Sequence, residues 1–201
     1  VAVDRPDRKG RIQILKVHTR GKPMAPSIDL EKLAGQTPGF TGADLANLIN
    51  ESALLAARDG LKAIAEKQLE EGIMRVIAGP EKKSRLMSDK ERLITAYHEM
   101  GHALVGHYLP GCDPVHKISI INRGQALGYT ISMPTEDKFL TSRSELTDTM
   151  AMTLGGRAAE EIIFGEITTG TSNDLEKVTE TAKQMVMRFG MSEKLGPRVF
   201  G

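Results

Sequence analysis

The pentapeptide His98-Glu99-Met100-Gly101-His102 constrains the fold and chemistry of this chain more than any other part of its sequence. Residues four apart lie one turn apart on one face of an α-helix, so a helical backbone would offer both imidazoles to one metal ion. Glu99 lies one step further around such a helix, within reach of a metal-bound water. This is the H-E-x-x-H pattern, in which two neutral histidines bind Zn²⁺ and the glutamate is the general base.

The residues around the pentapeptide predict a helix that begins near Ser88 and ends before Pro110. Ser88-Asp89-Lys90-Glu91 is a capping box of the S-x-x-E type, and Pro110-Gly111 stops the element. Between them apolar side chains recur at helical spacing: Leu93, Ile94, Tyr97, Leu104, Val105 and Tyr108. Because Met100 and Ala103 add apolar character on other sides, we expect this helix to be largely buried.

The two histidines have an alternative interpretation as core residues, hydrogen-bonded to backbone or carboxylate groups. The spacing of the second histidine and the glutamate beside the first favour the metal site. The two other histidines nearby, His107 and His116, are interpreted as structural or solvent-facing.

A catalytic zinc site needs a third protein ligand and an open position for water. Two downstream places offer carboxylates: Glu160-Glu161 within a predicted helix, and Asp174 at the start of another. The glutamates can also form a solvated face or pair with Arg157, and Asp174 can simply be an acid at a helix N-terminus. Spacing leaves this choice open. The helix after Asp174 has a predicted apolar face: Leu175, Val178, Ala182, Met185, Val186 and Phe189.

The composition excludes several classes of protein. A net charge of +1 and 4% aromatic residues give no argument for nucleic-acid binding. The lone Cys112 excludes a disulfide framework and a thiolate zinc cluster, and is compatible with a reducing compartment. No apolar run approaches the roughly 18 to 20 residues of a membrane-spanning helix, and no signal peptide is visible. With 201 residues, of which 40% are hydrophobic, we expect one to two domains.

Several motifs together resemble the FtsH family of membrane-anchored, ATP-dependent zinc proteases. They are the metal motif, L-G-G-R-A-A-E-E-I-I-F-G at residues 154–165 and T-T-G-T-S-N-D-L at residues 168–175. Upstream, residues 3–18 resemble the start of the AAA lid of that family, and residues 37–45 resemble its sensor-2 segment. The resemblance covers essentially all 201 residues.

The resemblance implies roles for particular residues. It makes Asp174 the third zinc ligand, with one Zn²⁺ per chain, and places Glu160 beside a ligand histidine, which it would orient. It also implies that three lid residues approach the adenosine of a nucleotide: His18, Gly42 and Ala43. Met100 departs from the family pattern, which usually has a small residue there. We interpret it as a packing change on the side of the helix away from the metal.

The expected fold class is mainly α, with a helical AAA lid followed by a mostly α-helical zinc peptidase domain that contains a small β-sheet. The lid covers residues 1–80, a linker covers 81–87, and the peptidase domain covers 88–201 and is expected to be C-terminally truncated. Lid helices are predicted at 8–19, 29–34, 41–59 and 66–78, and strands at 115–121 and 126–133. The inner side of the third helix should be Leu45, Leu48, Ile49, Ala53, Leu54 and Ala56.

These expectations describe an ATP-dependent zinc metalloendopeptidase that degrades unfolded or membrane proteins. An extended substrate is expected to add to the edge of the second strand, at Gly128, Tyr129 and Thr130. The alternative is a catalytically inactive module for nucleotide sensing and assembly in an AAA ring.

Some properties are expected of the full-length protein only. The chain has no G-x-x-x-x-G-K-[ST] loop, so ATP and Mg²⁺ are expected to bind elsewhere in that protein. The resemblance implies a homo-hexamer that is anchored by N-terminal membrane helices outside this chain, with these domains on the cytoplasmic, matrix or stromal side. The segment itself is expected to be soluble and not to bind nucleic acid.

Overall fold

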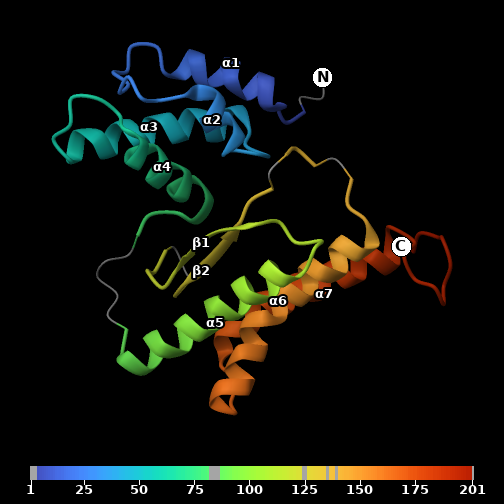
Figure 1. Cartoon of the computed structure of the whole chain (residues 1–201). Coiled ribbons are helices and arrows are strands. Elements are labelled where there is room, and N and C mark those ends of the chain that lie inside the picture. Colours follow the sequence, from blue (N-terminus) through green and yellow to red (C-terminus); the bar gives the residue numbers. More distant parts are fainter. Residues whose placement is uncertain (1–3, 82–86, 124–125, 135, 139, 201) are drawn as a thin grey trace. The chain divides into compact units, whose positions relative to one another are not determined.

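The computed structural model describes residues 4–81, 87–123, 126–134, 136–138 and 140–200. Within these ranges it contains seven α-helices and one two-stranded antiparallel sheet (Figure 1), which confirms the mainly α fold class. The chain divides into two compact units. The first comprises the described parts of 1–83, 122–125 and 134–137, and the second comprises those of 84–121, 126–133 and 138–201. The predicted linker over 81–87 lies largely outside the described residues.

The first unit contains four helices, close to the predicted ranges: α1 (Arg8–His18), α2 (Leu30–Gly35), α3 (Gly42–Arg58) and α4 (Glu66–Ala78). Side-chain caps explain where three of them begin. Asp7 and Asp29 accept hydrogen bonds from the first turns of α1 and α2. Thr41 and Asp44 form a reciprocal capping box at α3. These caps satisfy backbone N–H groups that have no partner within the helix.

The core of this unit centres on α3, which packs against α1 and α4. The prediction for Leu54 was wrong, because that side chain is 56% exposed, whereas Ser52 and Leu55 are buried. The buried face follows Leu45 at intervals of three and four residues, and Leu54 lies off it by about one helical step. Helix α4 comes very close at Gly72, where a Cβ would lie 2.3 Å from Ser52 Oγ.

Two buried arginines hold later parts of the chain in the first unit. Arg11 Nη1 donates to Asp137 Oδ1 at 2.8 Å. Arg123 Nη2 donates to Glu71 Oε2 at 2.7 Å and to Glu81 Oε1 at 2.8 Å. Charged groups this deeply buried are retained only when they are paired and hydrogen-bonded. The segments around 123 and 137 therefore belong structurally with the first 81 residues.

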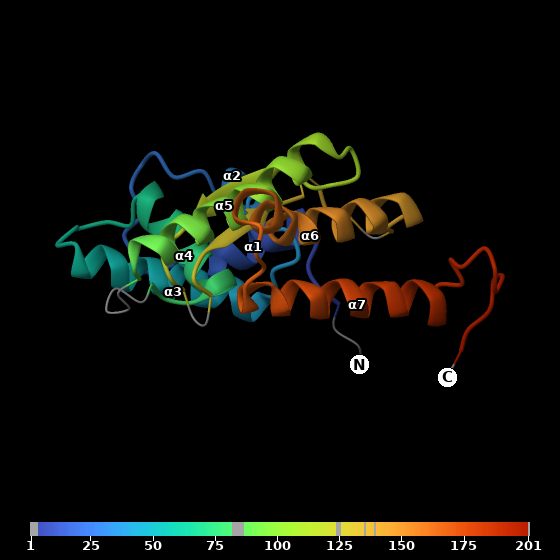
Figure 2. The same cartoon turned by 90° about the horizontal axis from the view of Figure 1, so that it is seen from below.

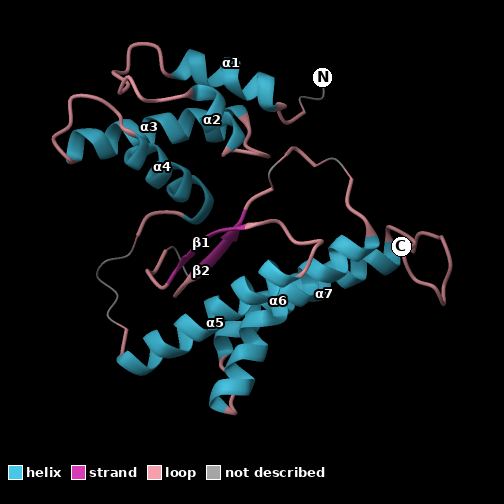
Figure 3. Ribbon diagram, in the orientation of Figure 1, coloured by secondary structure: helices cyan, strands magenta, loops and turns pink. Residues whose placement is uncertain are grey.

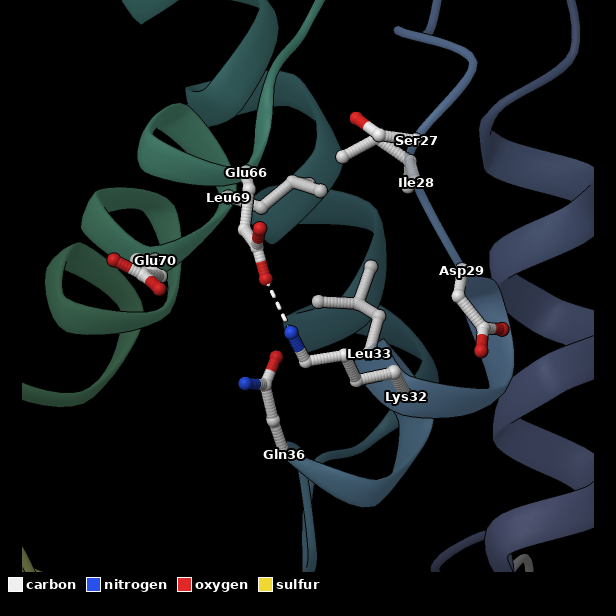
Figure 4. A pocket seen from close by; sticks show the side chains of 9 residues that line it. All are labelled: Ser27, Ile28, Asp29, Lys32, Leu33, Gln36, Glu66, Leu69 and Glu70. Carbon is white, nitrogen blue, oxygen red and sulfur yellow. Dashed lines mark hydrogen bonds and ion pairs between the residues drawn. The ribbon is translucent and has the colours of Figure 1, made fainter.

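A small hollow lies between α2 and α4 (Figure 4). Lys32 and Glu66, both largely exposed, form an ion pair beside it. The other lining residues are Ser27, Ile28, Asp29, Leu33, Gln36, Leu69 and Glu70.

The second unit contains α5 (Asp89–Tyr108), β1 (Val115–Ser119), β2 (Tyr129–Ser132), α6 (Arg143–Phe164) and α7 (Ser172–Met187), as coloured in Figure 3. The capping box predicted at Ser88 is present, and Ser142 with Glu145 forms another at α6. The two strands pair antiparallel, Ile118 opposite Thr130, and are shorter than predicted. Pairing requires a partner over the same length, which alternation within one strand does not specify.

The prediction that α5 is largely buried was wrong. Five apolar side chains along it are exposed: Leu93, Tyr97, Met100, Leu104 and Tyr108. The buried strip consists of smaller residues and Glu99, because α6 crosses α5 in backbone contact. A Cβ on Gly101 would lie 2.3 Å from the carbonyl oxygen of Gly155. Helical spacing predicted that apolar side chains line one face of α5, but it did not predict which face of α5 another helix would cover.

Helix α7 lies against α6 (Figure 2). Its predicted apolar face is buried only at Met185, whereas Leu175, Ala182, Val186 and Phe189 are exposed. No helix in the described ranges is both long and apolar enough to cross a lipid bilayer.

Candidate metal centre

The crossing of α5 and α6, together with the first turn of α7, brings three potential metal ligands to one point. His98 and His102 lie on one face of α5, with their Nε2 atoms 3.0 Å apart. Asp174 Oδ2 lies 3.3 Å from His98 Nε2 and 3.4 Å from His102 Nε2. The ligand atoms of the three residues all lie within 4.8 Å of one another. One ion can therefore contact all of them.

Asp174 reaches this point because the chain turns sharply just before α7. The turn is a short 3₁₀ segment (Thr169–Thr171), and Asp174 lies in the first turn of the helix that follows. Burial raises the pKa of the Asp174 carboxyl, but the adjacent imidazoles of His102 and His98 lower it well below its usual range. The carboxylate is therefore ionised and available as an oxygen ligand.

Glu160 connects one histidine to the turn that carries Asp174. Its side chain is 1% exposed, with Oε1 2.7 Å from His98 Nδ1 and Oε2 accepting from the Thr168 N–H at 2.7 Å. Burial lowers the pKa of His98, but its hydrogen bonds to Asp174 and Glu160 raise that pKa above the ordinary value. With Nδ1–H donating to Glu160, the neutral form of His98 would present its Nε2 lone pair to an ion at the shared point. Glu160 thus lies outside the three-residue group, and Glu161 is exposed.

The backbone of α6 orients the second histidine. His102 Nδ1 lies 2.9 Å from the carbonyl oxygen of Met152, to which an Nδ1–H donates. This hydrogen bond selects the tautomer whose Nε2 is free to bind a metal. Sequence reasoning missed Met152, because a backbone carbonyl can come from any residue type.

Gly156 provides the space between the two imidazoles. A Cβ there would lie 2.6 Å from His98 Nε2 and 2.7 Å from His102 Nε2. Any side chain would therefore fill the volume that a metal ion needs, so these residues fit a bound metal. Sequence reasoning missed this role. The only signal in the sequence was that Gly156 belongs to the G-G-R motif.

Glu99 lies beside the histidines and is 6% exposed. Thr130 Oγ1 donates to Glu99 Oε2 at 2.7 Å. Burial raises the pKa of the Glu99 carboxyl, and the Thr130 hydrogen bond and the two histidines partly offset that rise. A carboxylate with a raised pKa is a stronger base, as proton abstraction from water requires.

The remaining predicted residues lie elsewhere. His107 and His116 are exposed, in agreement with their interpretation. Within the first unit, His18 ends α1, while Gly42 and Ala43 begin α3. Nothing in the structure tests their proposed proximity to a nucleotide, so that role stays a prediction.

The comparisons with known proteins agree with this geometry. Residues 85–201 match the family model of peptidase family M41, and residues 27–71 match that of the AAA+ lid domain. This chain belongs to peptidase family M41. The resemblance to FtsH proteases and to an AAA lid is confirmed.

Curated relatives match this M41 chain along all or nearly all of its length. It is 81% identical over 201 residues to ATP-dependent zinc metalloprotease FtsH 1 of Conexibacter woesei and 63% identical over 196 residues to ATP-dependent zinc metalloprotease FtsH of Rubrobacter xylanophilus. It is also 57% identical over 202 residues to ATP-dependent zinc metalloprotease FtsH of Thermotoga maritima. These alignments cover 100%, 98% and 100% of this chain, but the chain spans only about a third of each relative (31%, 30% and 33%).

Proposed function

We propose that this chain carries the peptidase centre of an ATP-dependent zinc metalloendopeptidase. In this proposal His98, His102 and Asp174 bind one Zn²⁺, and Glu99 is the general base. The observation that carries it is the convergence of the three ligand atoms within 4.8 Å, from two helices distant in sequence. The family match and the names of the relatives support the same activity.

The donor set suits zinc better than the harder divalent cations. Two imidazole nitrogens and one carboxylate oxygen form a common three-ligand set of catalytic zinc sites, whereas Mg²⁺ and Ca²⁺ favour all-oxygen sites. Three protein ligands leave a fourth position for water. The absence of a side chain at Gly156 leaves room for the ion, and Glu160 would hold His98 in the metal-binding orientation.

Bound zinc would supply Lewis acidity and lower the pKa of the attacking water towards neutrality. Glu99 would accept a proton from that water and later deliver it to the leaving amine of the cleaved peptide. Asp174 would contribute the negative charge that balances the ion. The Glu160 carboxylate would raise the basicity of His98 and strengthen it as a ligand.

The other properties concern the complete protein, of which this chain covers about a third in its relatives. We propose that unfolded polypeptides are the substrates and that they bind along the strand at Gly128, Tyr129 and Thr130 through main-chain hydrogen bonds. ATP and Mg²⁺ would bind mainly outside this chain, with His18, Gly42 and Ala43 near the nucleotide. A membrane-anchored homo-hexamer with these domains on the cytoplasmic, matrix or stromal side is part of the same proposal.

The proposal is tested by measuring bound zinc and casein degradation for the complete protein and its Glu99→Gln variant. The variant should bind one zinc per chain, as the unmodified protein does, and lose peptide hydrolysis by orders of magnitude, because an amide cannot accept the proton. Normal degradation by this variant would exclude Glu99 as the base. Absence of zinc from an active protein would exclude the metal site.

A further inference from the structure

The side chain of Thr130 on β2 forms a hydrogen bond with Glu99, the proposed general base. Thr130 Oγ1 lies 2.7 Å from Glu99 Oε2 and 3.0 Å from the Glu99 backbone oxygen. A hydroxyl has one proton to donate, and the shorter distance to the ionised oxygen identifies the carboxylate as the main acceptor. The carboxylate is thus tied to a strand as well as to its own helix.

Gly128 lies near the other oxygen, Oε1, of the same carboxylate. Gly128 directly precedes β2, and a Cβ on it would point towards α5, as the Thr130 side chain does. The Gly128 backbone is buried, and a Cβ on it would lie 2.8 Å from Glu99 Oε1 and 2.9 Å from Glu99 Cγ. The Glu99 carboxylate therefore occupies space that any side chain at residue 128 would need.

The two oxygens of Glu99 have different environments. Oε2 accepts the Thr130 hydrogen bond, whereas Oε1 accepts no hydrogen bond from the residues that the structure describes. The hydrogen bond thus holds the carboxylate through Oε2 and leaves the lone pairs of Oε1 available for a proton.

We propose that Thr130 is a positioning residue for Glu99, which it holds so that Oε1 receives the proton of the attacking water, and that the absence of a side chain at Gly128 leaves the space that the carboxylate occupies. This inference rests on the proposed role of Glu99 as general base. It gives the Thr130 side chain a task separate from any main-chain hydrogen bonds that the strand makes with substrate. Removal of the hydroxyl should therefore affect turnover and leave substrate binding nearly unchanged.

The experiment compares Thr130→Val, which keeps the shape and removes the hydroxyl, with Thr130→Ser, which restores the hydroxyl, in the complete zinc-loaded protein. We expect Thr130→Val to lower kcat for casein about 10- to 100-fold, since small displacements of a catalytic group have effects of this size. KM, zinc stoichiometry and the thermal unfolding midpoint should change little. Thr130→Ser should retain kcat within about threefold of the unmodified protein.

Ser132→Ala is the matched control, because Ser132 lies two residues further on β2 and its hydroxyl faces Met152 Sδ at 3.9 Å instead of Glu99. It should leave kcat unchanged. If Thr130→Val does not fold, Thr130→Ala takes its place in the comparison with serine.

The outcomes separate this inference from the proposed function. Loss of hydrolysis by Glu99→Gln together with normal kcat for Thr130→Val would overturn only the positioning role. Loss of zinc by Thr130→Val, a rise in KM alone, or failure of serine to restore kcat would also overturn it. Normal degradation by Glu99→Gln would instead overturn the proposed function.

Discussion

Single residues at the candidate metal centre have different proposed roles, and separate substitutions can distinguish these roles. Asp174 Oδ2 lies 3.3 Å from His98 Nε2 and 3.4 Å from His102 Nε2, whereas Glu160 contacts His98 at Nδ1, on the far side of that ring. Removing a ligand reduces metal affinity more than removing the partner of a ligand.

Asp174→Asn should therefore weaken zinc binding much more than Glu160→Gln. For Glu160→Gln we expect about a 10- to 100-fold loss, typical of a residue that orients a ligand. Competitive zinc titration with a chromogenic chelator measures both affinities. The opposite order of effects would make Glu160 the third ligand.

Gly156 gives a second prediction at this scale. Gly156→Ala should lower zinc affinity by more than about 100-fold, because its Cβ would occupy the space between the two Nε2 atoms and displace the ion rather than merely reorient a ligand. The same titration provides the measurement, and circular dichroism verifies that the helices persist. Unchanged affinity would show that the ion lies away from Gly156.

At the scale of elements, the crossing of α5 and α6 determines where the ligands lie. Gly155→Ala should destabilise the fold by about 1–3 kcal/mol, because its Cβ would lie 2.5 Å from the Gly101 carbonyl oxygen and force the helices apart. This reverses the usual gain of up to about 1 kcal/mol when alanine replaces a helical glycine. Urea unfolding measures the change.

Gly106→Ala on α5 is the control for that prediction. Its Cβ would meet the end of the flexible Met152 side chain, 2.8 Å away at Sδ, which can move aside. We expect a clearly smaller loss of stability. Equal losses for the two variants would contradict the close helix crossing.

The elements themselves show which features local sequence predicts. The capping box at Ser88 identified the start of α5 to within a residue, because a cap is a contact between neighbours in sequence. Strand ends were predicted less well, because they depend on the partner strand. Burial along α5 was predicted wrongly. The contact between α5 and α6 occurs at Gly101 and Gly155, and the spacing of apolar residues contains no information about that contact.

At the scale of the whole molecule, zinc would connect helices that are distant in sequence. His98 and His102 lie in α5 and Asp174 lies in α7, so the ion would cross-link both ends of the second unit. Adding zinc to the metal-free chain should raise the thermal unfolding midpoint. At a free zinc concentration 1,000 times Kd, the stabilisation would be about 4.1 kcal/mol. Differential scanning calorimetry checks this, and His98→Ala, which lacks a ligand, should show almost no zinc-dependent rise.

The first unit depends on a different long-range contact. Arg123→Met should destabilise it by about 1–3 kcal/mol, because Glu71 and Glu81 would lose a buried hydrogen-bond donor while remaining partly solvated. Hydrogen exchange of amides in α4 measures the change within that unit. Arg58→Met, which removes an exposed pair with Asp59, should have almost no effect.

The sequence by itself determined the helices, the mainly α class and the residues that can bind a metal, since capping, periodicity and the H-E-x-x-H spacing are all local. The distances that place Asp174 and not Glu160 beside both histidines, the space at Gly156 and the hydrogen bond from Thr130 to Glu99 are features of the tertiary structure alone. Each of them joins residues at least 31 positions apart, which meet because two helices cross at glycines and a strand lies beside them. Spacing along a chain describes one element at a time, whereas a metal centre requires the angles and separations between several.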